Sequence, residues 1–317
     1  MNATTLLTPF AEDILTGLSA DQKHIPSKYF YDDNGSRIFM QIMKMPEYYP
    51  TACEFEILSR QSAQILEQLP FTDAFNIVEL GCGDGLKTIQ LLTAFTAHDA
   101  NFTYIPVDIS AEAITTITAN VGNALPGIEM KPQIADYFSV MDKLAEEGKP
   151  CLYLFLGGNI GNYTAVEAKE LLTRLNASMR KGDMLLMGID LQKNPRTIQK
   201  AYDDPHGITR AFNLNLLHRI NAELDADIKP DQFEFYCDYS PATGEVNSYL
   251  ISLKQQHVHS VTLNHTFTFE KDELVWTELS NKYTPEEIEA LAINTGFTVK
   301  HNFKDCRHYF TDSLWIK

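Results

Sequence analysis

Short apolar runs alternate with helix-like segments through the middle of the chain. The runs are nearly continuous rather than alternating, which is typical of strands buried on both faces of a parallel sheet. They lie at residues 77–80, 102–108, 152–156 and 184–191. Residues 297–301 and 309–316 are expected to close the sheet as a terminal strand pair with an antiparallel terminal strand. The order of strands and helices predicts a mostly parallel, doubly wound α/β sheet.

Helix starts are marked by hydroxyl side chains at characteristic spacings. Residues 51–54 and 164–167 fit the capping-box pattern, and Thr284 is expected to precede a third helix. Asn34-Gly35 is a turn signal, so Ser36 is expected to cap a helix that runs through residue 44. A further short helix is expected within residues 1 to 25.

The pattern changes after residue 193, where strand-like segments replace the strand–helix alternation. This change predicts a second, smaller α+β domain, inserted into the chain and joined by the N-terminal segment. The expected cofactor-binding domain comprises residues 62–192 plus 284–317. The expected substrate-binding domain comprises residues 1–61 plus 193–283.

Three glycines follow the first buried strand at alternate positions. Gly81, Gly83 and Gly85 permit a tight turn and a close approach of a ligand to the backbone. Leu86 occupies the third glycine position of a dinucleotide fingerprint and the glycine position before Lys-Thr in a P-loop. The remaining pattern, Glu-x-Gly-x-Gly-x-Gly, favours an S-adenosylmethionine-dependent methyltransferase, although a purely structural turn has the same glycines.

Polar residues at the ends of later strands could complete such a site. Asp108 ends the second strand, where an acid can accept hydrogen bonds from a ribose, but it could equally cap the next helix. Asp136 and Tyr137 fit an acceptor for an adenine amine and a ring that stacks on it. Asn162 follows the fourth strand at the ligand-binding edge, where its alternative role is to stabilise a turn.

Two further groups of side chains have both a structural and a functional interpretation. Tyr31 and Tyr48 lie in aromatic-rich loops, and they could be ordinary half-buried rings or could line a small-molecule pocket. Glu278 and Ser280 share one face of a strand, since strand side chains alternate. An acid beside a hydroxyl suits a ligand with N–H groups, whereas a solvated polar face is the ordinary alternative.

Composition narrows the functional classes. The 317 residues carry a net charge of −16 without a basic cluster, which argues against nucleic acid as a partner. The five cysteines show no metal-ligand spacing and fit reduced thiols, so no metal site is expected. No signal peptide or membrane-spanning run is recognised, and we expect a cytoplasmic protein with a small-molecule substrate and no obligate protein partner.

Several ordered segments are more specific than the glycine turn. They are FYDDNGS at 30–36, PEYYPT at 46–51, FLG at 155–157, IGN at 160–162, AYDD at 201–204, AFNLN at 211–215 and TELS at 277–280. On these segments the chain resembles the histidine Nα-methyltransferases of ergothioneine biosynthesis, which trimethylate L-histidine to hercynine. The resemblance extends from residue 29 to residue 315.

The resemblance implies roles for the matching positions. Cofactor contacts are implied for Gly81, Gly83, Lys87, Asp108, Asp136 and Tyr137, with Lys87 near the methionine carboxylate. Asn162 and Tyr48 are implied catalytic residues that hold the amino-acid end of histidine together with Tyr202 and Tyr31, while Glu278 and Ser280 recognise the imidazole. These two sets are expected to meet in one cavity.

One position departs from the family pattern. Ser248 stands where a methionine near the imidazole is expected. A second hypothesis is therefore an Nα-methyltransferase of another amino acid, such as tryptophan or a modified histidine. A third is a catalytically silent S-adenosylmethionine-binding regulatory protein, and an NAD oxidoreductase is disfavoured by Leu86.

Overall fold

The structure is a computed structural model that describes residues 7–317, so the beginning of the helix expected near the N-terminus lies outside the described residues. It divides into two units. The first unit comprises Met1–Tyr49 and Lys193–Ser280, and the second comprises Pro50–Gln192 and Asn281–Lys317. Residues 50–61, which the sequence assigned to the substrate-binding domain, therefore group with the second unit. The reason is that helix α3 (Tyr49–Glu67) buries Glu54 against elements of that unit.

The second unit is built on a seven-stranded sheet in the order β11-β12-β5-β4-β1-β2-β3. Its parallel strands are β1 (Phe75–Leu80), β2 (Phe102–Asp108), β3 (Gln133–Ile134), β4 (Cys151–Phe155) and β5 (Met184–Asp190). Strand β12 (Phe310–Ile316) pairs antiparallel with both β5 and β11 (Thr298–Lys304), so it alone runs opposite to the other strands. The predicted α/β class, with a mostly parallel sheet and an antiparallel terminal strand, is confirmed.

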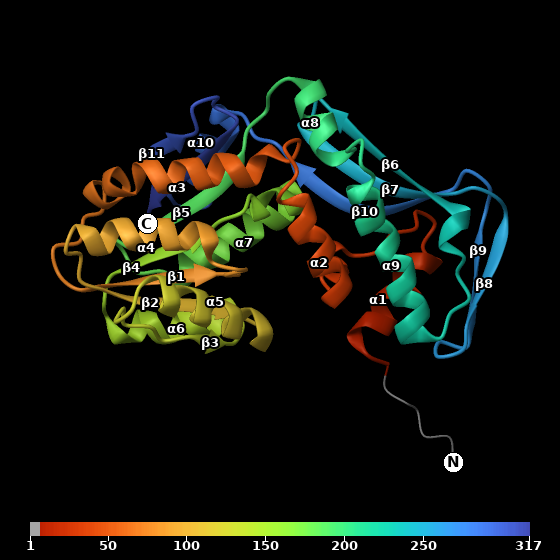
Figure 1. Cartoon of the computed structure of the whole chain (residues 1–317), viewed down its shortest axis with the longest axis horizontal. Helices are drawn as coiled ribbons and strands as arrows, with labels where there is room; N and C mark the ends of the chain where they lie inside the picture. Colours follow the sequence, from red (N-terminus) through yellow and green to blue (C-terminus); the bar gives the residue numbers. More distant parts are fainter. Residues whose placement is uncertain (1–6) are drawn as a thin grey trace, which may run out of the picture. The chain divides into compact units, whose positions relative to one another are not determined.

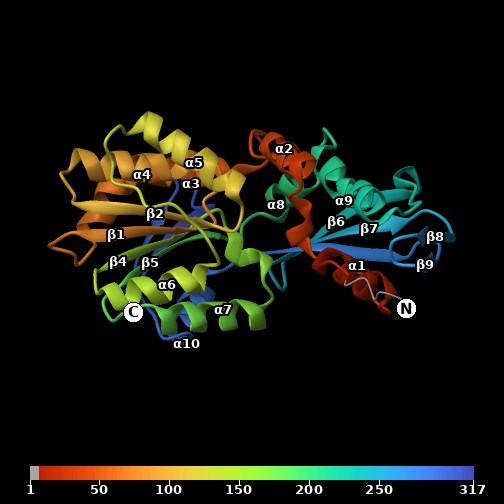
Figure 2. The ribbon, with the colours of Figure 1, turned by 90° about the horizontal axis from the view of Figure 1, so that it is seen from below.

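Helices cover both faces of this sheet (Figures 1 and 2). One face carries α3, α4 (Leu86–Ala97) and α5 (Ala111–Ala124). The other carries α6 (Tyr137–Glu147), α7 (Ala165–Ser178) and α10 (Pro285–Asn294), whose apolar residues form one buried cluster with the strands. Strands β1, β2, β4 and β5 are buried along almost their whole length, which explains their continuous apolar runs.

The first unit is smaller and combines helices with antiparallel strands. Its helices are α1 (Pro9–Ser19), α2 (Asp33–Ile42), α8 (Pro195–Tyr202) and α9 (Ile208–Leu224), with short helices η1 (Ser27–Phe30) and η3 (Pro230–Gln232). Strands β6 (Phe233–Ser240), β7 (Glu245–Ser252) and β10 (Leu274–Asn281) form a sheet in the order β10-β7-β6, and β8 (Gln256–Ser260) pairs with β9 (His265–Phe269). Figure 1 shows α9 running beside the three-stranded sheet, and its apolar residues share one core with α1 and these strands.

Two of the expected helix starts are wrong and two are confirmed. Helix α2 is capped by Asp32 rather than Ser36, because the Asp32 carboxylate accepts a 2.7 Å hydrogen bond from the Gly35 amide. Helix α3 begins at Tyr49, so residues 51–54 form no capping box and Glu54 is directed elsewhere. The capping boxes at the starts of α7 and α10 are both present.

Candidate functional site

The glycine turn after β1 has the backbone conformation that its sequence predicts. Gly81, Gly83 and Gly85 have φ values of +76°, +52° and +73°, in the left-handed region that favours glycine. A Cβ on Gly81 would lie 2.8 Å from the Tyr137 hydroxyl, whereas a Cβ on Gly83 would meet no heavy atom within 4 Å. The turn therefore presents bare backbone to open space at Gly83 and packs closely against Tyr137 at Gly81.

The two candidate cofactor acids lie at the ends of neighbouring strands. The Gly81 amide donates to the Val107 carbonyl at 3.0 Å, and the Ala135 amide donates to the Asp108 carbonyl at 3.0 Å. These backbone bonds bring the glycine turn, Asp108 and the start of α6 to the same edge of the sheet. Burial raises the pKa of the Tyr137 hydroxyl, and the charge of Asp108 raises it further, which is consistent with their proximity.

Both acids accept hydrogen bonds from nearby backbone amides, but only Asp136 caps a helix, because the N-cap of α5 is Ser110 rather than Asp108. Asp108 Oδ1 accepts from the Ser110 amide at 2.9 Å. Asp136 is the N-cap of α6, and its Oδ1 accepts from the Phe138 and Ser139 amides at 3.0 and 3.2 Å. Hydrogen bonds from Ser139, first through its side chain and then through its backbone, lower the pKa of the exposed Asp136 carboxyl. One oxygen of each carboxylate is thus committed to the backbone, and the other is available to a ligand.

Lys87 lies in the first turn of α4, where it forms an ion pair with Glu54 of α3. Burial lowers the pKa of the Lys87 ammonium, but Glu54 outweighs this effect, and the net shift is upward. The Lys87 side chain keeps 22% of its surface exposed, so it is not closed off by the pair. The helix N-terminus beside it adds a partial positive charge suited to an anionic ligand group.

Asn162 belongs to the second unit, at the end of the short helix η2 (Asn159–Asn162) that follows β4. Gly161 packs against Asn281, because a Cβ there would lie 2.8 Å from the Asn281 carbonyl oxygen. The Asn281 amide group donates to the Tyr163 carbonyl at 2.8 Å. Within residues 7–317 the Asn162 side chain makes no hydrogen bond, so the turn around it is held by other residues.

The first unit contains the predicted substrate-binding residues other than Asn162, and contacts connect several of them. Tyr202, at the end of α8, shares a 2.9 Å hydrogen bond with Ser280 of β10. The Tyr48 ring lies edge-on to the Tyr202 ring with centroids 6.1 Å apart. Phe39 and Phe212 connect Tyr48 to Tyr31 through ring contacts of 5.4 to 6.2 Å. The aromatic loops are therefore one cluster rather than isolated surface rings.

Glu278 lies electrostatically close to this cluster. Burial raises the pKa of the Tyr31 hydroxyl above its ordinary value, and the charge of Glu278, followed by Tyr202, raises it further. The Tyr31 residue as a whole is 48% exposed. Sequence analysis gave no role to Phe39 or Phe212, although Phe212 lies in the 211–215 segment that carries the resemblance.

Ser248 is buried in the middle of β7, opposite Cys237 of β6. The Trp276 indole donates to the Asn247 side chain at 3.0 Å, and the Thr277 hydroxyl donates to the Ser248 carbonyl at 3.1 Å. Because side chains alternate along strands, Asn247 shares the face of Trp276, whereas Ser248 points to the opposite face. Continued alternation along β10 places Glu278 on the face of Trp276, away from the Ser248 side chain.

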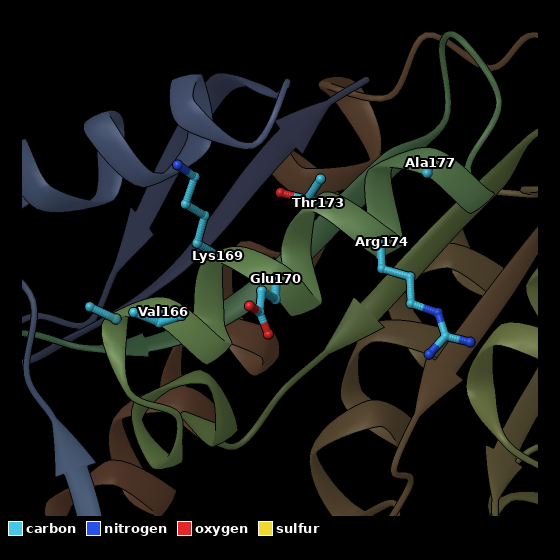
Figure 3. A pocket seen from close by; sticks show the side chains of 7 residues that line it. Val166, Lys169, Glu170, Thr173, Arg174 and Ala177 are labelled. Carbon is cyan, nitrogen blue, oxygen red and sulfur yellow. The ribbon is translucent and has the colours of Figure 1, made fainter.

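A surface hollow lies elsewhere on the second unit (Figure 3). It is lined by residues of α7, namely Ala165, Val166, Lys169, Glu170, Thr173, Arg174 and Ala177. None of these residues belongs to the predicted site. The Arg174 guanidinium lies 3.6 Å from the centre of the Phe138 ring and is therefore already engaged at the rim. The hollow therefore contributes no group to the candidate site.

Comparison with known proteins identifies a family over almost the whole chain. The profile of the family described as histidine-specific, S-adenosylmethionine-dependent methyltransferases matches residues 10–317. A histidine N-alpha-methyltransferase of Mycolicibacterium smegmatis is 36% identical over 305 residues, covering 96% of this chain and 94% of that protein. The enzyme of the same name from Mycobacterium tuberculosis is 35% identical over 278 residues, covering 88% and 85%.

A more distant relative is longer. The ergothioneine biosynthesis protein 1 of Schizosaccharomyces pombe is 27% identical over 298 residues, which cover 88% of this chain and 37% of that protein. The matched region therefore corresponds to one part of the fungal protein. Within residues 7–317, no helix combines the length and apolar character that a membrane span requires.

Proposed function

We propose that this chain, which belongs to the family of histidine-specific, S-adenosylmethionine-dependent methyltransferases, trimethylates the α-nitrogen of L-histidine to hercynine. The reaction is a step of ergothioneine biosynthesis. Support comes from the named relatives and from the cluster of Tyr31, Tyr48, Tyr202 and Ser280 in the first unit, close to Glu278. That cluster is the observation that carries the proposal, because it joins polar groups from distant parts of the chain.

The residues of the second unit fit the methyl donor. Gly83 offers open backbone, and the Tyr137 hydroxyl covers Gly81. Asp108 has a free oxygen for ribose hydroxyls and Asp136 has one for the adenine amine, while Lys87 faces the carboxylate of the donor. When bound, S-adenosylmethionine supplies a methyl group on a positively charged sulfur.

The protein's own residues orient the amine that receives this methyl group. In the proposal, Asn162 and Tyr48 hold the α-nitrogen, and Tyr202 and Tyr31 hold the carboxylate of histidine. The nitrogen must be neutral so that its lone pair can form the new N–C bond while the C–S electrons remain on sulfur. Each round releases one proton. Orientation of this kind can supply about 7–11 kcal/mol of a barrier.

The aromatic cluster also suits repeated methylation. Each methyl group makes the nitrogen a larger cation, and tyrosine faces attract such cations by about 0.5–2 kcal/mol. Glu278 and Ser280 are proposed to bind the imidazole, with the carboxylate accepting from a ring N–H. Ser280 is held in turn by Tyr202, at 2.9 Å.

The proposal requires a small-molecule substrate and no nucleic acid, membrane or obligate protein partner, and it places the reaction in the cytoplasm. The net charge of −16 and five free cysteines support this assignment. Another amino acid, such as tryptophan, remains a second candidate substrate because Ser248 departs from the expected residue. The position of Ser248 on the face opposite Trp276 weakens that argument.

Mass spectrometry of the products after incubation with L-histidine and S-adenosylmethionine tests the proposal. We expect histidine to gain three methyl groups, all located on the α-nitrogen by fragmentation. Methylation of the ring, accumulation of only the monomethyl product, or turnover of tryptophan without turnover of histidine would each contradict it. An equimolar panel of amino acids with labelled donor serves as the control for selectivity.

A further inference from the structure

Glu54 joins three elements of the second unit, although the sequence pattern predicted only a capping-box role for it. Its carboxylate is fully buried on α3. Oε1 accepts from the Gly157 amide at 2.7 Å, just after β4, and Oε2 is paired with the Lys87 ammonium of α4. A Cβ on Gly188 of β5 would lie 2.2 Å from Glu54 Oε1, so the carboxylate lies against bare backbone.

Asp312 lies near this pair, on β12, the strand next to β5. It is paired in register with Gly188, and it is fully buried. Within residues 7–317, neither of its carboxylate oxygens has a hydrogen-bond partner. Burial, reinforced by the charge of Glu54, raises the pKa of the Asp312 carboxyl well above its ordinary value, although Lys87 opposes the shift.

These contacts define a cluster of two buried carboxyls and the partly exposed Lys87 ammonium, in which one carboxyl is unpaired. With Asp312 protonated, the charges of Glu54 and Lys87 cancel. An ionised Asp312 would add an uncompensated charge in a buried place, which is strongly unfavourable. The neutral cluster is therefore the stable form.

We propose that Glu54 is a positioning residue that keeps Lys87 charged and directed toward the cofactor's carboxylate, with Asp312 as the protonated member of the cluster. This inference rests on the proposed function for the role of Lys87. An ammonium has three N–H donors, so the pair with Glu54 leaves others for a ligand. The same carboxylate fixes the Gly157 amide, and thus the loop that leads to Asn162.

The inference predicts how Lys87 titrates. Burial alone lowers the pKa of Lys87, and nearby carboxylates raise it, with Glu54 of α3 making the largest contribution. Removal of the Glu54 charge removes the strongest of these opposing effects. Lys87 should then lose its proton at a lower pH, and affinity for the amino-acid end of the cofactor should fall as the pH rises.

Calorimetric binding of S-adenosylhomocysteine without histidine provides the test. We compare the ratio of the Kd of Glu54→Gln to the Kd of the wild type at two pH values. We expect this ratio to increase about tenfold between about pH 7 and pH 9. Comparison with wild type cancels titration of the ligand itself. The Glu54→Gln, Lys87→Arg double variant should remove this pH dependence, because arginine stays charged. Asp312→Asn should stay within about threefold of wild type, because it replaces a neutral acid with a neutral amide.

Methylthioadenosine, which lacks the amino-acid end, is the matched ligand control, and its Kd should not respond to Glu54→Gln. A flat pH profile for Glu54→Gln, or a loss of about tenfold or more in Asp312→Asn, would overturn the inference. If Glu54→Gln does not fold, NMR titration of Lys87 in the wild type decides, since a Lys87 pKa below the ordinary value for lysine contradicts the proposal. If the wild type does not bind S-adenosylhomocysteine, both this inference and the proposed function are contradicted. If it binds S-adenosylhomocysteine but does not turn over histidine, only the proposed function is contradicted.

Discussion

The hydroxyls of Tyr202 and Ser280 lie 2.9 Å apart and share one hydrogen bond. Tyr202 ends helix α8 and Ser280 lies near the end of β10, so the bond connects a helix to a strand 78 residues away. Both residues are buried, at 8% and 6% exposure. The bond therefore restricts the direction of the Ser280 hydroxyl.

Tyr202→Phe should weaken histidine binding without affecting the cofactor. Loss of one hydrogen bond of about 0.5–1.5 kcal/mol predicts a roughly threefold to tenfold increase in the KM for histidine. The Kd for S-adenosylhomocysteine should be unchanged. Tyr236→Phe, at an exposed ring of β6, is the control and should leave both constants at their wild-type values. An unchanged histidine KM in Tyr202→Phe would show that this hydroxyl does not act on the substrate.

Glu278→Ala should have the larger effect on histidine. A hydrogen bond to a charged group contributes about 1.5–3 kcal/mol, which predicts a KM increase of roughly tenfold to 150-fold. Steady-state kinetics with each substrate varied in turn would measure it, and the KM for S-adenosylmethionine should change little. Glu234→Ala, at an exposed position of β6, provides the charge-matched control. Equal losses for both substrates would assign Glu278 to folding instead of imidazole recognition.

The sheet was predictable because the residues of each main strand are themselves enough to indicate a buried strand. Continuous burial forces continuous apolar runs in β2, β4 and β5, and the glycine turn follows β1 with no intervening element. The capping boxes of α7 and α10 were predictable for the same reason, since both partners lie within one turn. Local rules fail where a contact outside the expected pattern competes with them.

Glu54 illustrates that failure. Its spacing from Thr51 fits a capping box, yet its carboxylate binds Lys87 and an amide 103 residues away. The start of α2 illustrates a second kind of failure, because a Cβ on Gly35 would lie 1.7 Å from the Phe30 carbonyl oxygen. Gly35 is therefore required for close packing inside a helix, although next to Asn34 it reads as a turn. Neither constraint is visible in a window of a few residues.

The two roles of Asp136 can be separated by substitution. Asp136→Asn keeps an oxygen for the Phe138 and Ser139 amides but replaces the second acceptor with a donor. We expect an unchanged melting temperature and a severalfold higher Kd for S-adenosylhomocysteine, because an adenine amine can no longer donate to this side chain. Asp136→Ala should weaken binding and also lower the melting temperature through loss of the N-cap. Wild-type affinity in Asp136→Asn would leave this residue with its capping role alone.

Glu79 links the stability of the second unit to pH. Its buried carboxylate accepts hydrogen bonds from the Thr88 and Tyr104 hydroxyls. Burial nevertheless raises its pKa from 4.5 to about 7, with the hydrogen bonds and Lys87 opposing the shift. Between these two values the folded state binds more protons than the unfolded state, so this group's contribution to stability falls as the pH rises. Below pH 4.5 the contribution is complete, and above about pH 7 it is lost.

Glu79→Gln should abolish this pH dependence, since glutamine resembles the protonated acid and does not titrate. A shift from 4.5 to about 7 corresponds to an effect on the order of 3 kcal/mol. Relative to wild type, the free energy of unfolding of the variant should therefore increase by that order between about pH 4.5 and pH 8, as measured by urea denaturation. Other groups titrate equally in both proteins and cancel in the difference, and Glu129→Gln, at an exposed position, should show no such trend. A difference that stays constant with pH would mean that Glu79 is ionised throughout, held by its two hydroxyl donors against the effect of burial.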